Sequence, residues 1–87
     1  LKIGMVHSVH PVAQLKAAAN ALARELAAMP PLAVAGILRC VVGAGAASLP
    51  DALAEERRAV LRCAGTRDQQ EGFAAFLAKR KPVFAGG

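Results

Sequence analysis

The C-terminal stretch of the sequence, residues 66–87, constrains the fold most, because it contains a complete helix with its start and stop signals. Thr66 followed three residues later by Gln69 has the pattern of a capping box, in which the hydroxyl and the amide satisfy backbone N–H groups at a helix start. Asp68 and Glu71 place negative charge near the positive end of the helix dipole. The sequence therefore predicts a helix that begins just after Thr66.

The same helix carries an apolar face and ends in a cluster of cations. Phe73, Phe76 and Leu77 lie at spacings that bring both rings and the leucine to one side of a helix. Residues Lys79–Lys81 crowd its last turn, where positive charge interacts favourably with the dipole. Pro82 disfavours helical angles in the residue before it, so the helix is expected to end there.

Three more helices are predicted upstream, separated by proline and glycine. The first follows Pro11, the second covers residues 33–42 after a Pro-Pro pair, and the third runs from Ser48, as N-cap, to Gly65, as a left-handed cap. The narrow apolar seam of the first helix fits either packing on a core or coiled-coil pairing. The apolar residues expected on the covered faces are Val12, Leu15, Ala19, Leu22, Leu26, Met29, Val34, Ile37, Leu38, Val41, Val42, Leu49, Leu53, Val60, Leu61 and Ala64.

Residues 1–10 alternate with a period of two, with Ile3, Met5, His7 and Val9 on one face, which predicts a short strand. A single strand has no sheet of its own to join, so its edges need another chain, further sequence or water. The expected fold is therefore mainly α, with one short N-terminal strand in residues 1–10 and about four helices in residues 11–87.

The composition favours a small core. The chain has 87 residues and is 55% hydrophobic, but 21 residues are alanine and only 3 are Phe, so many apolar positions contribute little buried area each. A chain of this length buries only ~60 to 65% of its unfolded surface. We therefore expect it to need a partner surface. It opens on Leu1 inside the predicted strand, which favours a fragment of a larger protein.

Several functional classes are disfavoured by the charge pattern and the cysteine content. The net charge of +5 is compatible with phosphate-bearing ligands, but the 11 Lys and Arg are scattered and form no recognition-helix motif, so no nucleic-acid partner is expected. No apolar run reaches the ~20 residues of a membrane span, so no membrane partner is expected either. Cys40 and Cys63 fit neither a disulfide framework nor a zinc site, which indicates reduced thiols and a cytoplasmic protein.

The residues by themselves describe no active site. There is no glycine-rich phosphate loop, no Ser/His/Asp order and no HExxH motif. His7 and His10 point to opposite faces of the predicted strand and cannot share a metal. Glu55 and Glu56 are adjacent on a helix and diverge by about 100 degrees, which argues against shared acid–base work. We therefore predict no catalytic residue and no metal site in this chain, and expect the chain alone to be inactive.

The order of several short motifs resembles the C-terminal signature of the crotonase superfamily, the enoyl-CoA hydratases and isomerases. The resemblance covers nearly the whole chain, but only the last third of a typical family member. The residues that carry it are Gly4, Met5, Val6, Val9, Pro11, Leu22, Ala23, Pro30, Pro31, Leu32, Ala33, Thr66, Asp68, Glu71, Gly72, Ala75, Phe76, Leu77, Lys79, Arg80, Lys81, Pro82, Phe84 and Gly86.

The resemblance implies an enzyme that acts on acyl-CoA thioesters through an oxyanion hole of two backbone amides, located upstream of this chain. It implies no cofactor, since coenzyme A (CoA) enters as part of the substrate. It also implies a homo-oligomer, a trimer or a dimer of trimers, in which these helices cover a neighbour's CoA site. Phe76 and Lys79 match the aromatic residue and the lysine that contact bound CoA in relatives. Core packing explains Phe76 equally well, and a favourable helix-end charge of ~0.3 to 1 kcal/mol is the other explanation for Lys79.

Two positions depart from the family pattern. Leu38 stands where many relatives have lysine, and Ala78 replaces the glutamate of the FLEKRKP form of the motif. Hydration, isomerisation, decarboxylation and dehalogenation share this C-terminal pattern, so the reaction type stays open. The alternative function is a freestanding helical oligomerisation module without catalysis.

Overall fold

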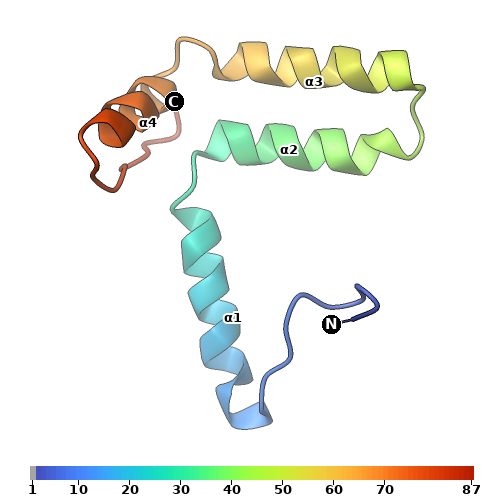
Figure 1. Ribbon diagram of the computed structural model, residues 1–87, viewed down its shortest axis with the longest axis vertical. Helices are drawn as coiled ribbons and strands as arrows, with labels where there is room; N and C mark the ends of the chain where they lie inside the picture. The colour runs from blue at the N-terminus through green and yellow to red at the C-terminus, as the bar shows by residue number, and fades with distance from the viewer. Residues whose placement is uncertain (1) are drawn as a thin grey trace.

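The computed structural model describes residues 2–87 and has four helices, as Figure 1 shows. The mainly helical prediction is confirmed, and the breaks between the helices lie near the predicted proline and glycine positions. The predicted end of the last helix at Pro82 is wrong: the helix ends at Leu77, because Lys79 adopts a left-handed backbone, so Lys79–Lys81 follow the helix instead of forming its last turn. The helices are α1 (Val12–Ala27), α2 (Pro31–Ala44), α3 (Leu49–Cys63) and α4 (Arg67–Leu77).

The strand predicted at the N-terminus is wrong for residues 2–10, which form turns and bends before α1, while Leu1 lies outside the described residues. An alternating pattern makes a strand only where a neighbouring strand receives its N–H and C=O groups. Residues 2–87 contain no second strand to pair with it. The division into residues 1–10 and 11–87 stays a prediction.

The predicted caps of α3 and α4 are formed. The Ser48 hydroxyl accepts a hydrogen bond from the Asp51 N–H at 3.3 Å, and the Thr66 hydroxyl accepts one from the Gln69 N–H at 3.2 Å. The Gln69 side-chain oxygen accepts from the N–H of Gly65, at 2.7 Å, rather than from that of Thr66. Gly65 has φ +77°, which confirms the predicted left-handed cap between α3 and α4.

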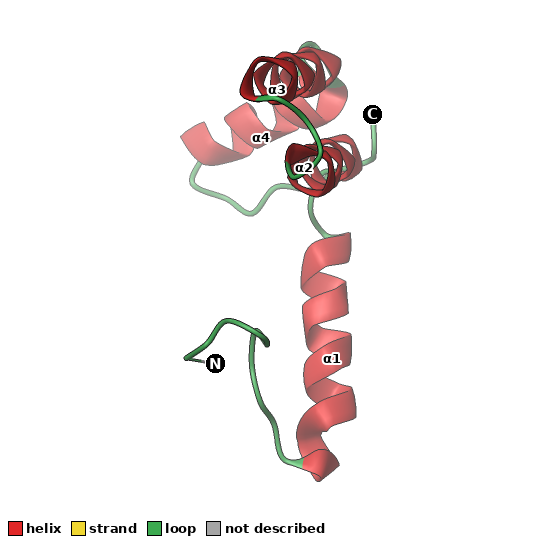
Figure 2. Cartoon of the chain, turned by 90° about the vertical axis from the view of Figure 1, so that its right-hand side faces the viewer, coloured by secondary structure: helices red, strands yellow, loops and turns green. Residues whose placement is uncertain are grey.

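Helices α2 and α3 lie side by side and antiparallel, and their closest approach is made by small residues (Figures 1 and 2). Gly36 is buried in α2, and a Cβ atom built on it would lie 3.3 Å from the Cβ of Ala59 in α3. That distance is shorter than an ordinary carbon–carbon contact. The missing side chain of Gly36 therefore sets how closely the two helices pack.

The apolar faces expected to be covered are largely exposed, so this part of the prediction is wrong for the chain on its own. Helix α1 has no buried residue, and Val12 is 90% exposed. In α2 and α3 the small residues make the closest contact, and Ile37, Val41 and Val60 line an open groove beside it. The large apolar residues that remain exposed include Leu15, Leu22, Leu26, Met29, Ile37, Leu38, Val41, Val42, Leu49, Leu53, Val60 and Leu61.

The arrangement of the helices is open. Figure 2 shows α1 standing away from the α2–α3 pair, and the axis bends by 106° between α1 and α2. The radius of gyration is 16.4 Å, against about 12 Å for a compact domain of this length. Within residues 2–87 the only buried apolar side chain is that of Ala75. The exposed faces therefore need cover from outside this chain.

No single helix within residues 2–87 is long and apolar enough to cross a membrane. Helices α1 and α2 meet the length and composition criterion only when taken together, across the 106° bend.

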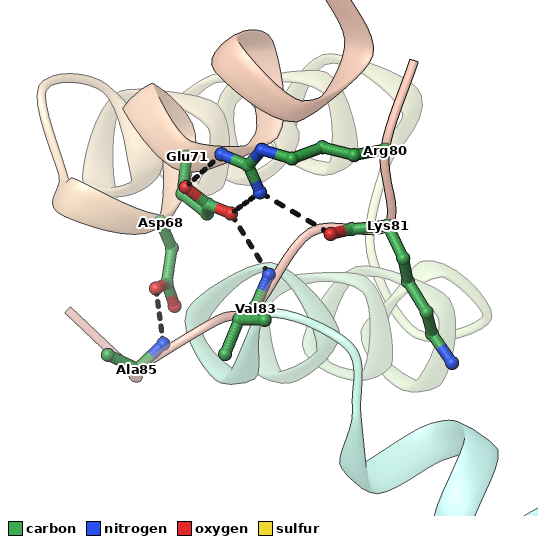
Figure 3. A network of polar contacts seen from close by, with 6 residues as sticks. All are labelled: Asp68, Glu71, Arg80, Lys81, Val83 and Ala85. Carbon is green, nitrogen blue, oxygen red and sulfur yellow. Dashed lines mark hydrogen bonds and ion pairs between the residues drawn. The ribbon is translucent and has the colours of Figure 1, made fainter. Parts of the chain in front are cut away.

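The C-terminal tail, residues 82–87, folds back along α4, and Asp68 binds its far end (Figure 3). The Asp68 carboxylate accepts hydrogen bonds from the N–H groups of Ala85, at 2.7 Å, and Gly86, at 2.9 Å. The Asp68 N–H donates to the carbonyl oxygen of Gly87 at 3.3 Å. Asp68 is only 5% exposed, so these bonds satisfy a carboxylate that has lost most of its water. The tail is therefore attached to α4 up to its last residue.

A second carboxylate binds the near end of the tail. Glu71 accepts hydrogen bonds from both terminal nitrogens of Arg80, at 2.5 and 3.0 Å, and from the N–H of Val83 at 3.1 Å (Figure 3). We call these three residues the Glu71 clamp. Between the two attachments the Phe84 ring covers Gly72, with its Cε1 atom 3.7 Å from where a Cβ would lie. The close neighbour of Gly72 is thus a side chain from the tail.

The Glu71 clamp predicts a pH-dependent attachment of the tail. The hydrogen bond from Arg80, followed by that from the Val83 N–H, lowers the pKa of Glu71 from 4.5 to about 2. A lowered pKa stabilises the folded form fully above about pH 4.5, and this contribution is lost as the pH falls through about 2. NMR titration of the Glu71 carboxyl and the Val83 amide should give a midpoint near 2, which Arg80→Gln should move up towards 4.5. A midpoint near 4.5 in the unmodified protein would contradict the clamp.

The contact between Gly36 and Ala59 predicts a position-specific cost of adding a side chain. Gly36→Leu should push α2 and α3 apart and destabilise the fold by about 1 to 3 kcal/mol, as overpacked contacts do. Gly43→Leu is the matched control, because a Cβ at Gly43 meets nothing within 4 Å and the gain in helix propensity is the same. Urea unfolding followed by circular dichroism measures both. Equal midpoints for the two variants would remove the close approach as a constraint.

Candidate functional site

The two residues predicted as a binding site lie at the C-terminal end of α4. Phe76 is in the last turn of the helix and is 81% exposed, so it is not packed in a core formed by this chain. Lys79 follows the helix by two residues and is also exposed. The structure thus places the ring and the ammonium-bearing side chain close together along the chain, on a surface open to a ligand or a partner.

An open apolar groove of about 540 Å³ lies beside Phe76. Residues at the start of α2, the end of α3, the inner side of α4 and the tail contribute to it, and all three Phe residues of the chain take part. The tail forms one wall by bringing Phe84 over α4. The lining residues are Pro30, Leu32, Ala33, Cys63, Thr66, Asp68, Gln69, Gly72, Phe73, Phe76 and Phe84.

Lys79 has a backbone conformation that non-glycine residues rarely adopt, with φ +52°. The Lys79 N–H donates to the carbonyl oxygen of Phe76 at 3.2 Å, and the Arg80 N–H donates to that of Ala75 at 3.0 Å. These two bonds form the Schellman motif that ends many helices, in which glycine usually occupies the left-handed position. A residue with a side chain at this position costs about 1 to 2 kcal/mol.

The basic residues that follow α4 differ in whether they are paired with an acid. Arg80 is paired with Glu71, and its pKa is raised by the hydrogen bonds with that carboxylate. Within residues 2–87 no ion pair is formed by Lys79 or Lys81, so both leave positive charge at this end of the helix. Lys79 carries its charge two residues past the helix that presents the exposed ring of Phe76, whereas Lys81 lines a hollow at the C-terminal end of α1. The combination suits a ligand that carries both a planar ring and phosphate groups.

The carboxylates near the groove are already occupied. Asp68 and Glu71 bind the tail, and on α3 Glu55 pairs with Arg62 and Arg58, with the hydrogen bond from Arg62 the main cause of its lowered pKa. Residues 2–87 contain no group of three His, Cys, Asp or Glu side chains placed to bind a metal ion. The described part of the chain therefore offers a binding surface, with no acid or base directed into the groove.

The roles of Asp68 and Glu71 were missed in the sequence. Both acids were explained by the helix dipole, whereas their carboxylates bind backbone N–H groups of residues 83–86. A pattern that could have revealed this is the spacing of three between the acids, which places them on one side of α4, followed by Arg80 and a Pro82 that turns the chain back.

Comparisons with known proteins agree on one family. The enoyl-CoA hydratase/isomerase family model matches residues 1–87. The chain is 35% identical over 83 residues to a probable mitochondrial enoyl-CoA hydratase of Dictyostelium discoideum and to a 2,3-dehydroadipyl-CoA hydratase of Escherichia coli (strain K12). Each match covers 95% of this chain, but only 30% and 32% of the respective relative.

Solved structures show the same relation. An enoyl-CoA hydratase from Mycobacterium marinum matches with a TM-score of 0.88 and 31% identity, over 99% of this chain and 35% of that protein. An enoyl-CoA hydratase subunit from Geobacillus kaustophilus HTA426 matches with a TM-score of 0.89 and 37% identity, over 99% and 34%. The chain spans about a third of the length of these relatives. With its whole length matched by the family model and its fold by solved members, the chain belongs to the enoyl-CoA hydratase/isomerase family.

Proposed function

We propose that this chain is the C-terminal helical part of an enzyme that acts on acyl-CoA thioesters, and that it serves assembly and covers the CoA site of a neighbouring subunit. The observation that carries the proposal is the set of exposed apolar helix faces on a chain that spans about a third of its relatives. Such faces mark interfaces. The backbone amides that would polarise the thioester are proposed to lie upstream, so residues 1–87 alone are inactive.

The assembly proposal is a homo-oligomer, a trimer or a dimer of trimers. Its support is the exposure of the large apolar side chains of α1, α2 and α3, which this chain leaves uncovered. Small residues at the α2–α3 contact leave these side chains free to bury area against a core or a second subunit. Part of this surface is proposed to pack on the upstream part of the same polypeptide.

The ligand proposal places Phe76 and Lys79 against the nucleotide end of CoA, across a subunit boundary. The exposed Phe76 ring can stack on a planar base, and the ammonium of Lys79 can act as a point-charge partner for phosphate oxygens. No cofactor is required beyond the CoA carried by the substrate.

A cytoplasmic location is also part of the proposal. Its support is the pair of free cysteines, Cys40 and Cys63, both half-buried. The Dictyostelium relative is named mitochondrial. The location is therefore tested by fractionation of cells that express the protein, with cytosol and mitochondria separated.

The isolated 87-residue chain should associate and should not catalyse hydration. Light scattering at micromolar concentration should show a species larger than a monomer, because the exposed apolar faces associate. Saturating crotonyl-CoA should give no turnover above buffer, since the proposed amide donors are upstream. A stable monomer with a cooperative melt would contradict the interface, and a hydration rate that survives repurification would contradict the upstream location of the oxyanion hole.

Lys79→Ala in the full-length protein should weaken the binding of acyl-CoA. The loss should be about 1 to 3 kcal/mol if the contact is shielded from water, and much smaller if it is wet. Because the nucleotide is remote from the thioester, KM should rise while kcat stays nearly unchanged. Steady-state kinetics with an acyl-CoA and with the same acyl group on pantetheine measure this, with Lys16→Ala on α1 as the matched control. Equal losses for both thioesters, or none, would leave Lys79 as a helix-terminal charge.

A further inference from the structure

The left-handed backbone of Lys79 requires an explanation outside its own helix cap. Strained conformations persist only where the surrounding structure holds them, and they concentrate at functional sites. Glycine would satisfy the same Schellman hydrogen bonds without strain. Lysine at this position therefore indicates that the side chain is needed and that neighbouring contacts hold its backbone.

Those contacts are made by the Glu71 clamp. One carboxylate binds the guanidinium of Arg80, the residue directly after Lys79, and the backbone N–H of Val83, three residues further on. The residue that carries this carboxylate lies in α4, five residues before Phe76. It is also shielded, because the Glu71 side chain is only 25% exposed while that of Arg80 is 47% exposed. Two attachments on one side of Lys79, and the helix on the other, leave its backbone little freedom.

We propose that Glu71 is a positioning residue for Lys79: by binding Arg80 and Val83 it fixes the left-handed turn and thereby the direction in which the Lys79 side chain leaves α4. The inference rests on the proposed contact between Lys79 and CoA. In this proposal Glu71 contacts no ligand. It acts by holding the backbone between residues 79 and 83 in place. The same attachment seats the tail that brings Phe84 to the groove beside Phe76.

A purely structural role for Glu71 makes a different prediction. If the clamp only attaches the tail, its loss lowers stability and affects all substrates alike. If it positions Lys79, its loss affects the CoA ester and spares the pantetheine ester, and it has no further effect once the Lys79 side chain is gone. A double-mutant cycle separates the two cases.

The experiment uses the full-length protein that contains this chain, with Glu71→Gln, Lys79→Ala and the double variant. Glu71→Gln should raise KM for the acyl-CoA about threefold to tenfold, as expected for weakening a charge-assisted bidentate pair, with kcat unchanged. KM for the pantetheine ester should stay within about twofold, since that ester lacks the nucleotide phosphates. In the Lys79→Ala background, Glu71→Gln should add nothing.

Two further variants keep the result interpretable. Glu55→Gln is the matched control, because Glu55 also binds arginines, Arg58 and Arg62, but lies on α3 away from Lys79. It should leave both KM values unchanged. Arg80→Lys keeps the charge but loses the bidentate geometry, so it should give an intermediate KM even if Glu71→Gln fails to fold.

Each of the other outcomes would contradict either the positioning role of Glu71 or the proposed contact between Lys79 and CoA. Additive effects of Glu71→Gln and Lys79→Ala, equal losses for both esters, or a KM change from Glu55→Gln as large as that from Glu71→Gln would overturn the positioning role. An effect of Lys79→Ala with none from Glu71→Gln or Arg80→Lys would overturn it while keeping the proposed CoA contact. No effect of Lys79→Ala would overturn the contact itself, and the positioning role with it.

Discussion

The close packing of α2 on α3 through Gly36 and Ala59 is the constraint on which the rest of the structure depends. Two helices that meet through small residues bury little apolar area, but their backbones come close, and their larger apolar side chains stay exposed. The pair therefore acts as a rigid support with apolar outer surfaces. Helix α1, and α4 with its tail, both extend from the same end of this support, where α2 begins and α3 ends, and neither covers those surfaces.

The helices could be predicted from sequence because their signals are local. Ser48, Thr66 and Gly65 act on residues within one turn, and each does in the structure what its chemistry requires. The strand and the covered faces could not be predicted in the same way. Periodicity tells which residues share a face, whereas a partner for that face is a property of the assembled structure. The contact between α2 and α3 is made by small residues, which do not stand out in the hydrophobic pattern of the sequence.

The candidate site also has features that could be predicted from the sequence and features that could not. The place of Phe76 in a helix that starts after Thr66 could be read from the capping signal and the helix period, whereas the end of α4 at Leu77, ahead of Pro82, could not. The backbone strain at Lys79 and the carboxylates that hold the tail could not be read, because they join residues up to 18 apart through backbone N–H groups. A backbone donor is present at every position except proline, so no residue type marks the ones that are used.

Attachment of the tail through its backbone has a consequence for how the sequence can change over evolution. Two carboxylates, those of Asp68 and Glu71, bind only backbone N–H groups of the tail. The bonds to Val83, Ala85 and Gly86 therefore do not depend on the side chains at these positions. Substitution at Val83 and Ala85 is therefore free of any polar requirement, except that proline, which lacks the donor, is excluded. Gly86 is restricted further, because its φ of +93° favours glycine. Phe84, whose N–H takes no part, is instead restricted by the shape of its ring over Gly72. The tail is thus expected to vary widely in composition among relatives while keeping its path and its single aromatic position.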